Sequence, residues 1–97
     1  MEKNEDILRK KDITAIYNPN DILSTIRGIN YTHKKTGNKG ISVIAQDLKV
    51  NIPQAVNNYD VDYSQLVALL IECVKNNTSE IKELKQEINT LKIILNQ

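Results

Sequence analysis

The C-terminal part of the chain carries an unbroken heptad repeat, and this repeat limits the possible folds more than any other feature. From Tyr63 onward, residues that are apolar at all but one position recur at alternating steps of four and three. The a positions are Val67, Val74, Ile81, Ile88 and Leu95, and the d positions are Tyr63, Leu70, Asn77, Leu84 and Leu91. This pattern is typical of a helix whose apolar seam packs against other helices in a coiled coil.

Charged residues beside the seam predict that the helices run parallel. Glu80 and Glu87 occupy g positions, and each lies five residues before an e-position lysine. The two lysines are Lys85 and Lys92. This is the spacing of interhelical ion pairs in a parallel coiled coil.

The heptads alone leave the number of helices open. β-Branched residues at a with Leu at d favour two strands. Leu66 and Cys73 at g, with Ile71 at e, widen the apolar surface as a trimer, or docking onto the rest of the chain, would require. A single amphipathic helix that covers its own domain is the alternative, and it gives no reason for the Glu–Lys spacing.

Length and charge limit the class of protein. The chain has 97 residues, and Lys plus Arg number 13 against 12 Asp plus Glu. Its core must come mostly from 14 Ile and 9 Leu, because Trp and Phe are absent. Such a core is marginal in so short a chain, so we expect one small domain that is stable as an oligomer. A net charge of +1 gives no basic excess for nucleic acid or an anionic membrane, and we expect neither partner.

Turn and capping residues predict several short elements before the heptads. Asn18 and Pro19 should begin a short helix over about 18–27 that Gly28 ends. Alternation over 29–34, the turn 35–40 and a return over 41–44 predict a β-hairpin. The chain should turn helical from 45 until Pro53, then turn at 57–58 before an extended piece around 60–61. Asp62 with Gln65 resembles a capping box at the start of the last helix.

These elements divide one domain into three parts. Residues 1–17 form a charged N-terminal arm, 18–62 a small α+β globular part, and 63–97 the coiled-coil helix. We therefore predict an α+β fold in which a small helix and β-hairpin part precedes a long C-terminal helix that forms a parallel coiled coil.

Chemistry-bearing residues are sparse. A lone Cys73 and a lone His33 make no disulfide and no metal-ligand set, and His33 is expected to be a half-buried packing residue. Gly37 and Gly40 fit a turn, and the lysines around them a solvated surface, better than a phosphate site. Capping explains Asp62 better than acid–base catalysis does. We expect no metal, no cofactor and no small-molecule substrate, and the absence of a secretory or spanning segment predicts a cytosol-like compartment.

Three segments resemble a known family in their order and spacing. They are ISVIAQDL at 41–48, PQAV at 53–56 and VDYSQLVALLIE at 61–72. Together they look like the intramolecular chaperone domain at the C-terminus of phage tailspikes, endosialidases and tail fibres, which is also similar to a segment of myelin regulatory factor. Tyr31 and His33, ahead of Lys34, match an aromatic pair of that family, and Ser42 replaces a common glycine.

The resemblance implies a homotrimer, with a parallel trimeric coiled coil, that helps an attached fibre to fold and then cuts itself free. The cut uses a serine nucleophile and a lysine five residues later. Matching the motif to this chain puts Glu5 at the serine position and Lys10 at the lysine position, and a register one residue earlier puts Asn4 at the serine position, which is no better. A carboxylate is a poor replacement for a hydroxyl in attack on a peptide bond, so we expect self-cleavage to be lost. Lys10 is then one member of a charged arm.

The leading hypothesis is a chaperone domain, from a phage or large DNA virus, that promotes folding and trimerisation of a fibre or tailspike-like protein without self-cleavage. It would act in the host cytoplasm during virus assembly, and stay with the virion if it is not cleaved. One alternative is a self-processing serine–lysine peptidase that releases itself from a fibre. Another is a plain trimerisation module.

Overall fold

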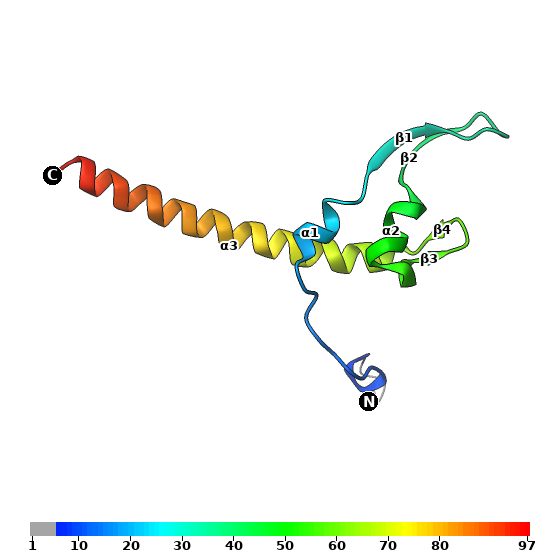
Figure 1. The fold of residues 1–97 in the computed structure, drawn as a ribbon, viewed down its shortest axis with the longest axis horizontal. Helices are drawn as coiled ribbons and strands as arrows, with labels where there is room; N and C mark the ends of the chain where they lie inside the picture. The colour runs from blue at the N-terminus through cyan, green and yellow to red at the C-terminus, as the bar shows by residue number, and fades with distance from the viewer. Residues whose placement is uncertain (1–5) are drawn as a thin grey trace.

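A long helix and a small globular part at one of its ends make up the molecule. The computed structural model describes residues 6–97, with extents of 66 × 46 × 27 Å (Figure 1). The long helix, α3 (Tyr63–Leu95), has 33 residues. A 3₁₀ turn, η1 (Asp6–Arg9), lies in the N-terminal arm. The predicted α+β class with a long C-terminal helix is confirmed.

Asp62 caps the start of α3, as the sequence predicted. Its carboxylate accepts hydrogen bonds from the backbone N–H and the hydroxyl of Ser64, at 3.1 and 2.6 Å. The side chain of Gln65 donates to the same carboxylate at 3.1 Å, whereas the backbone N–H of Asp62 donates to the carbonyl of Ala55 at 2.7 Å. The cap is therefore not a reciprocal capping box. The side-chain hydrogen bonds from Ser64 and then Gln65 hold the pKa of Asp62 below its ordinary value.

The predicted β-hairpin is confirmed. Strand β1 (Gly28–Thr32) pairs antiparallel with β2 (Lys39–Val43), and Tyr31 lies opposite Gly40. The tyrosine ring covers that glycine so closely that a Cβ on Gly40 would lie 2.9 Å from a ring carbon. A second, very short hairpin joins β3 (Val56–Asn57) to β4 (Asp60–Val61), and its turn at 58–59 lies one residue later than predicted.

The first helix is shorter than predicted. α1 spans Pro19–Leu23, because the hydroxyls of Ser24 and Thr25 donate back to main-chain carbonyls at 2.7 Å and close the last turn. Asn18 precedes α1 with a φ of 49° and makes no side-chain cap, so that expectation was wrong. Gly28 does not end the helix and instead opens β1.

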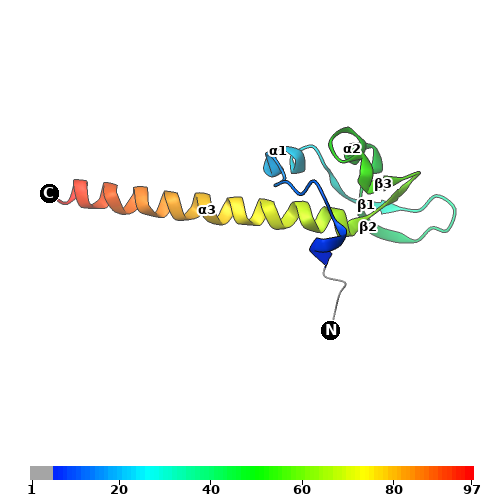
Figure 2. The same ribbon diagram turned by 90° about the horizontal axis from the view of Figure 1, so that it is seen from below.

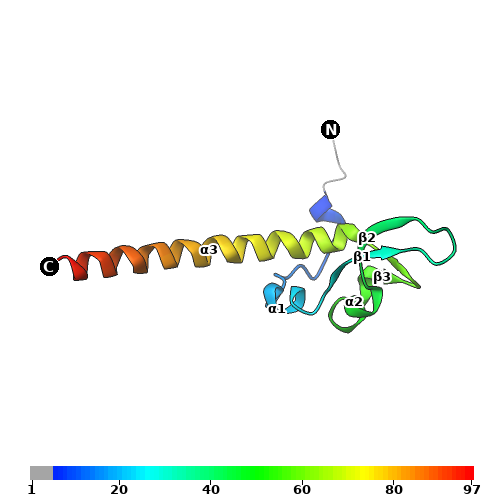
Figure 3. The same cartoon turned by 90° about the horizontal axis from the view of Figure 1, so that it is seen from above.

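Two further elements connect the hairpins. α2 (Ala45–Asn51) follows β2 directly, and a 3₁₀ turn, η2 (Pro53–Ala55), begins at the proline that was expected to stop the helix. In Figures 2 and 3, α1 and α2 lie on the same side of α3, and the β1–β2 hairpin projects beyond its N-terminal end.

The core is small and lies where α2 and η2 meet α3. Its buried members are Leu48, Ala55, Leu66, Leu69 and Cys73. Partly buried apolar residues from α1 and the strands surround them: Ile22, Leu23, Ile26, Val43, Ile52, Val56 and Val61. Burial of Cys73, and then the charge of Glu72, raise the pKa of the thiol. A five-residue core leaves the globular part dependent on α3.

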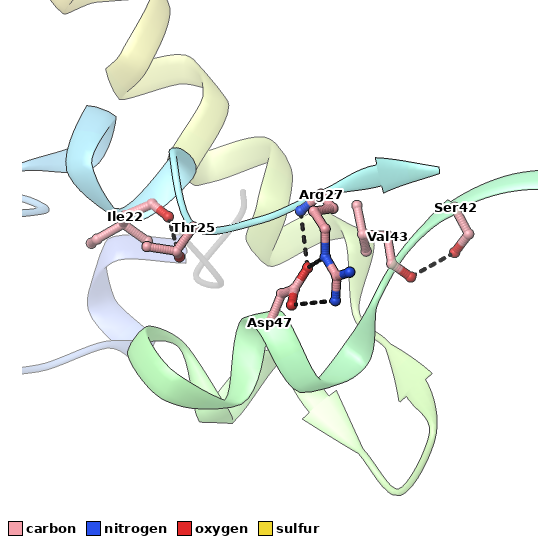
Figure 4. Close-up of polar contacts among 6 residues, drawn as sticks. All are labelled: Ile22, Thr25, Arg27, Ser42, Val43 and Asp47. Carbon is pink, nitrogen blue, oxygen red and sulfur yellow. Dashed lines mark hydrogen bonds and ion pairs between the residues drawn. The ribbon is translucent and has the colours of Figure 1, made fainter. Parts of the chain in front are cut away.

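One ion pair ties the end of the α1 region to α2 (Figure 4). The guanidinium of Arg27 forks onto the carboxylate of Asp47, with N···O distances of 2.9 and 3.1 Å, and the backbone N–H of Arg27 adds a third bond at 3.0 Å. Asp47 keeps only 14% of its side chain exposed. The hydrogen bonds from Arg27 lower the pKa of Asp47 and, in return, raise that of Arg27.

We expect the globular part to lose stability in acid. A folded-state pKa below the unfolded value means that the ionised carboxylate favours folding. For Asp47 and Asp62 this stabilisation is complete above the unfolded pKa, about 3.9, and is lost as the pH falls through the folded value. Thermal melts between pH 6 and pH 2 should show a smaller acid-induced drop for Asp47→Asn than for the native chain. Asp60→Asn is the control, and an equal drop in the Asp47 variant would contradict the assignment.

Candidate functional site

The rest of the chain covers two sides of α3 and leaves its heptad seam exposed, although Tyr63 and Asn77 each make one hydrogen bond to the globular part. On one side, Leu66, Leu69 and Cys73, at g and c positions, enter the core. On the other side, residues 13–16 of the arm line a shallow groove with Ala68, Ile71 and Glu72, at b, e and f positions. The a and d positions lie between these two sides. Leu66 and Cys73 thus dock onto the globular part, one of the two roles that the sequence left open for them.

The a and d side chains are exposed along the whole helix. Their exposed fractions run from 44% at Leu70 to 81% at Leu95. The apolar members are Tyr63, Val67, Leu70, Val74, Ile81, Leu84, Ile88, Leu91 and Leu95. Figure 1 shows that the C-terminal half of α3 extends free of every other element. An apolar stripe of this length is typical of a surface that another chain covers.

The four charged residues beside the seam are also available. Within residues 6–97 the ion pairs are Lys10–Asp6, Arg27–Asp47 and Lys75–Glu72. None of these uses Glu80, Lys85, Glu87 or Lys92, which are all exposed. A g residue and the e residue five positions later cannot meet on one helix, so their pairing requires a second helix.

Asn77, the polar residue of the seam, is held by α1. The side-chain amide of Asn20 donates to the Oδ1 of Asn77 at 3.0 Å. The amide of Asn76 donates in turn to the Oδ1 of Asn20 at 3.1 Å. Sequence reasoning missed Asn20, because no local pattern connects it with a residue 57 positions away.

The candidate catalytic lysine lies on an exposed turn. Lys10 directly follows η1, forms an ion pair with Asp6 and keeps 60% of its side chain exposed. Glu5, at the family's serine position, lies outside the described residues. Among residues 6–97 no group of three metal-ligating side chains comes together. The helices of that same range include none that is long and apolar enough to cross a membrane.

His33 does not pack in a half-buried site, and that expectation was wrong. The residue is exposed at the hairpin end, where its Nδ1 accepts a hydrogen bond from the backbone N–H of Lys35 at 3.2 Å. Its carbonyl accepts from the N–H of Gly37 at 2.9 Å, and that glycine has a φ of 76°. His33 therefore shapes the turn. Its imidazole serves local hydrogen bonding there and is not buried.

Two known proteins are similar to this chain. It is 36% identical over 102 aligned residues, 89% of the chain, to Long tail fiber protein Gp37 of Salmonella phage S16. It is 38% identical over 58 residues, 52% of the chain, to Long tail fiber protein Gp37 of Enterobacteria phage M1. The chain is related to phage tail fibre proteins.

This tail-fibre-related chain corresponds to a small part of those proteins. It spans 14% of the length of the Salmonella phage S16 fibre protein and 23% of that of phage M1. No protein-family model matches the chain, and no solved structure matches it. The viral and fibre-related part of the sequence-based interpretation is confirmed.

Proposed function

We propose that this chain is a chaperone domain that promotes folding and trimerisation of a phage tail fibre protein and stays attached to it. The observation that carries the proposal is the exposed a/d seam of α3, which the chain's own globular part leaves uncovered. Relationship to tail fibre proteins supplies the class of partner. The expected setting is the host cytoplasm during virus assembly and, without cleavage, the finished virion.

The seam favours three parallel helices. Ile71, at an e position beside the seam, is 53% exposed and would be covered by a neighbouring helix in a three-helix arrangement. Glu80 and Glu87 could then pair with Lys85 and Lys92 of adjacent copies, which fixes the parallel direction. The resemblance to trimeric chaperone domains supports the same number of chains.

Features of the globular part support a chaperone over a plain trimerisation module. A helix that only trimerises needs no docked hairpin, yet β1–β2 projects beyond the end of α3 (Figures 2 and 3). An isolated two-stranded hairpin is marginally stable in water. Ile41 on β2 is 82% exposed and Tyr31 on β1 is 42% exposed, so the hairpin offers apolar contact area to a partner.

The N-terminal arm supports retention of the domain. The family's cleavage needs a serine and a lysine that can take its proton. This chain has Glu5 at the serine position. Lys10, at the lysine position, is paired with Asp6. The proposed domain therefore lacks the nucleophile for self-release.

A fusion experiment tests this function. Residues 1–97 placed behind a trimeric β-fibre segment should raise the yield of soluble trimeric fibre several-fold and remain attached in intact-mass spectra. Glu5→Ser restores a hydroxyl at the serine position, with Lys10 as its base. This variant should release a fragment, and the native fusion should release none. A fragment that begins beside Glu5 in the native fusion would contradict retention.

The matched deletion removes residues 36–40, which are the hairpin tip and the first two residues of β2. This deletion leaves the seam and the core residues in place. A second deletion removes the remainder of the globular part as well. If both deletions give the same yield of folded trimeric fibre as the full domain, the domain is a plain trimerisation module.

A further inference from the structure

The amide of Asn77 has a defined orientation on the seam. Asn20, in α1, donates to its Oδ1, and Asn76, at a c position, donates to Asn20. Both contacts lie on the flank of α3 where the globular part docks. Because Oδ1 of the planar amide is engaged by Asn20 on that flank, Nδ2 is the end of the group left free to face the a/d seam. Within residues 6–97 that Nδ2 makes no hydrogen bond.

We infer that three copies of Asn77 form a binding site for a small monovalent anion on the axis of the trimer. The inference rests on the trimer proposed above, in which every d residue faces the common axis. Three NH₂ groups then converge on one point. Chloride is the physiological ion of this class.

The two neighbouring layers make the site dry. Val74 precedes Asn77 at an a position, and Ile81 follows it at the next one. Once three helices associate, these branched side chains exclude bulk water above and below the amides. A buried N–H group without a partner is costly, so the three NH₂ groups require an acceptor.

A halide satisfies such a ring better than water or the amides themselves. A water molecule accepts two hydrogen bonds but must also donate two, and a ring of donors gives it no acceptor. A ring of amides bonded to one another would need each Oδ1 to turn along the seam, and Asn20 holds Oδ1 of Asn77 towards α1. A monatomic anion accepts from all three donors and donates nothing.

The test compares salts at constant ionic strength on the full chain. Replacing sodium gluconate, whose anion is too large for the seam, with sodium chloride or bromide should raise the melting temperature. With one site per trimer, a halide concentration ten times the dissociation constant corresponds to a rise in melting temperature of about 2–4 °C. In crystals grown from bromide, an anomalous peak should lie on the three-fold axis at the Asn77 layer.

Two variants separate the site from general salt effects. Asn77→Leu should melt at a higher temperature in every salt and lose the halide-dependent rise, because it buries three apolar side chains in place of three amides. Asn20→Ala leaves Asn77 in place but frees its amide to rotate, so the halide-dependent rise should shrink while the mass stays trimeric.

The outcomes distinguish this site from the function on which it rests. A trimer without a bromide peak, or an equal halide response in Asn77→Leu, would overturn the anion site alone. A light-scattering mass that does not correspond to three chains would instead overturn the trimer, whatever the halide response.

Discussion

Ile88→Asp should convert the protein into monomers with a mass near 11.0 kDa. Ile88 occupies an a position in the free half of α3, where no other part of the chain contacts the helix (Figure 1). Removing an isoleucine of this kind from water is worth about 1.5–3 kcal/mol, and a trimer repeats the loss three times. The substitution also places three carboxylates around one axis, where burial of an unpaired charge is strongly unfavourable. Light scattering at micromolar concentration measures the outcome.

The same helix supplies a matched control. Ile93 lies at an f position and is 59% exposed in the single chain, close to the 52% of Ile88. Ile93→Asp makes the same chemical change on the side of α3 that faces away from the seam, so it should leave the mass unchanged. Dissociation by both variants would show that the interface is not the a/d seam, and a dimeric mass for the native chain would favour two helices.

Leu48→Ala should unfold the globular part without dissociating the proposed trimer of α3. Leu48 is fully buried between α2 and α3, and truncating a leucine in such a site costs about 2–5 kcal/mol. That cost is a large share of the stability of a small domain. Hydrogen exchange should then lose protection over residues 28–61, and protection in the C-terminal half of α3 should persist.

Val50→Ala, on the same α2 helix, is the control for this change. Val50 is 78% exposed, so its truncation should leave the exchange pattern as it is in the native chain. In the fibre fusion, Leu48→Ala should lower the yield of folded fibre without lowering the number of chains per particle. An unchanged fibre yield would assign the whole effect to the coiled coil.

Local periodicity explains which parts of the fold could be predicted. The heptads of α3 and the alternation in β1 and β2 are repeated patterns, so several residues report the same conformation. The start of α3 was equally predictable, because Asp62 caps the helix from within its own segment. The seam residues follow directly from the repeat, and in the single chain they are exposed.

Contacts between distant segments explain what could not be predicted. α1 ends at Leu23 because the following turn closes on itself and because Arg27 forms an ion pair with Asp47, 20 residues away in the sequence. Leu69, at a c position that a coiled coil leaves to solvent, is instead one of the most buried residues. Both depend on how the globular part docks, and no periodicity in the sequence carries that information.

Docking of the globular part onto α3 also makes Cys73 a built-in probe of local opening. Cys73 is the single thiol of the chain, and only 2% of it is exposed beneath the globular part. The thiolate is the form that attacks a thiol reagent, and burial disfavours the thiolate by raising the pKa of Cys73. Labelling must therefore await an opening of the core, whereas separation of the free α3 ends in the proposed trimer would leave the sulfur covered. The labelling rate therefore measures how often the globular part lifts from α3. It does so independently of subunit exchange and without any engineered probe.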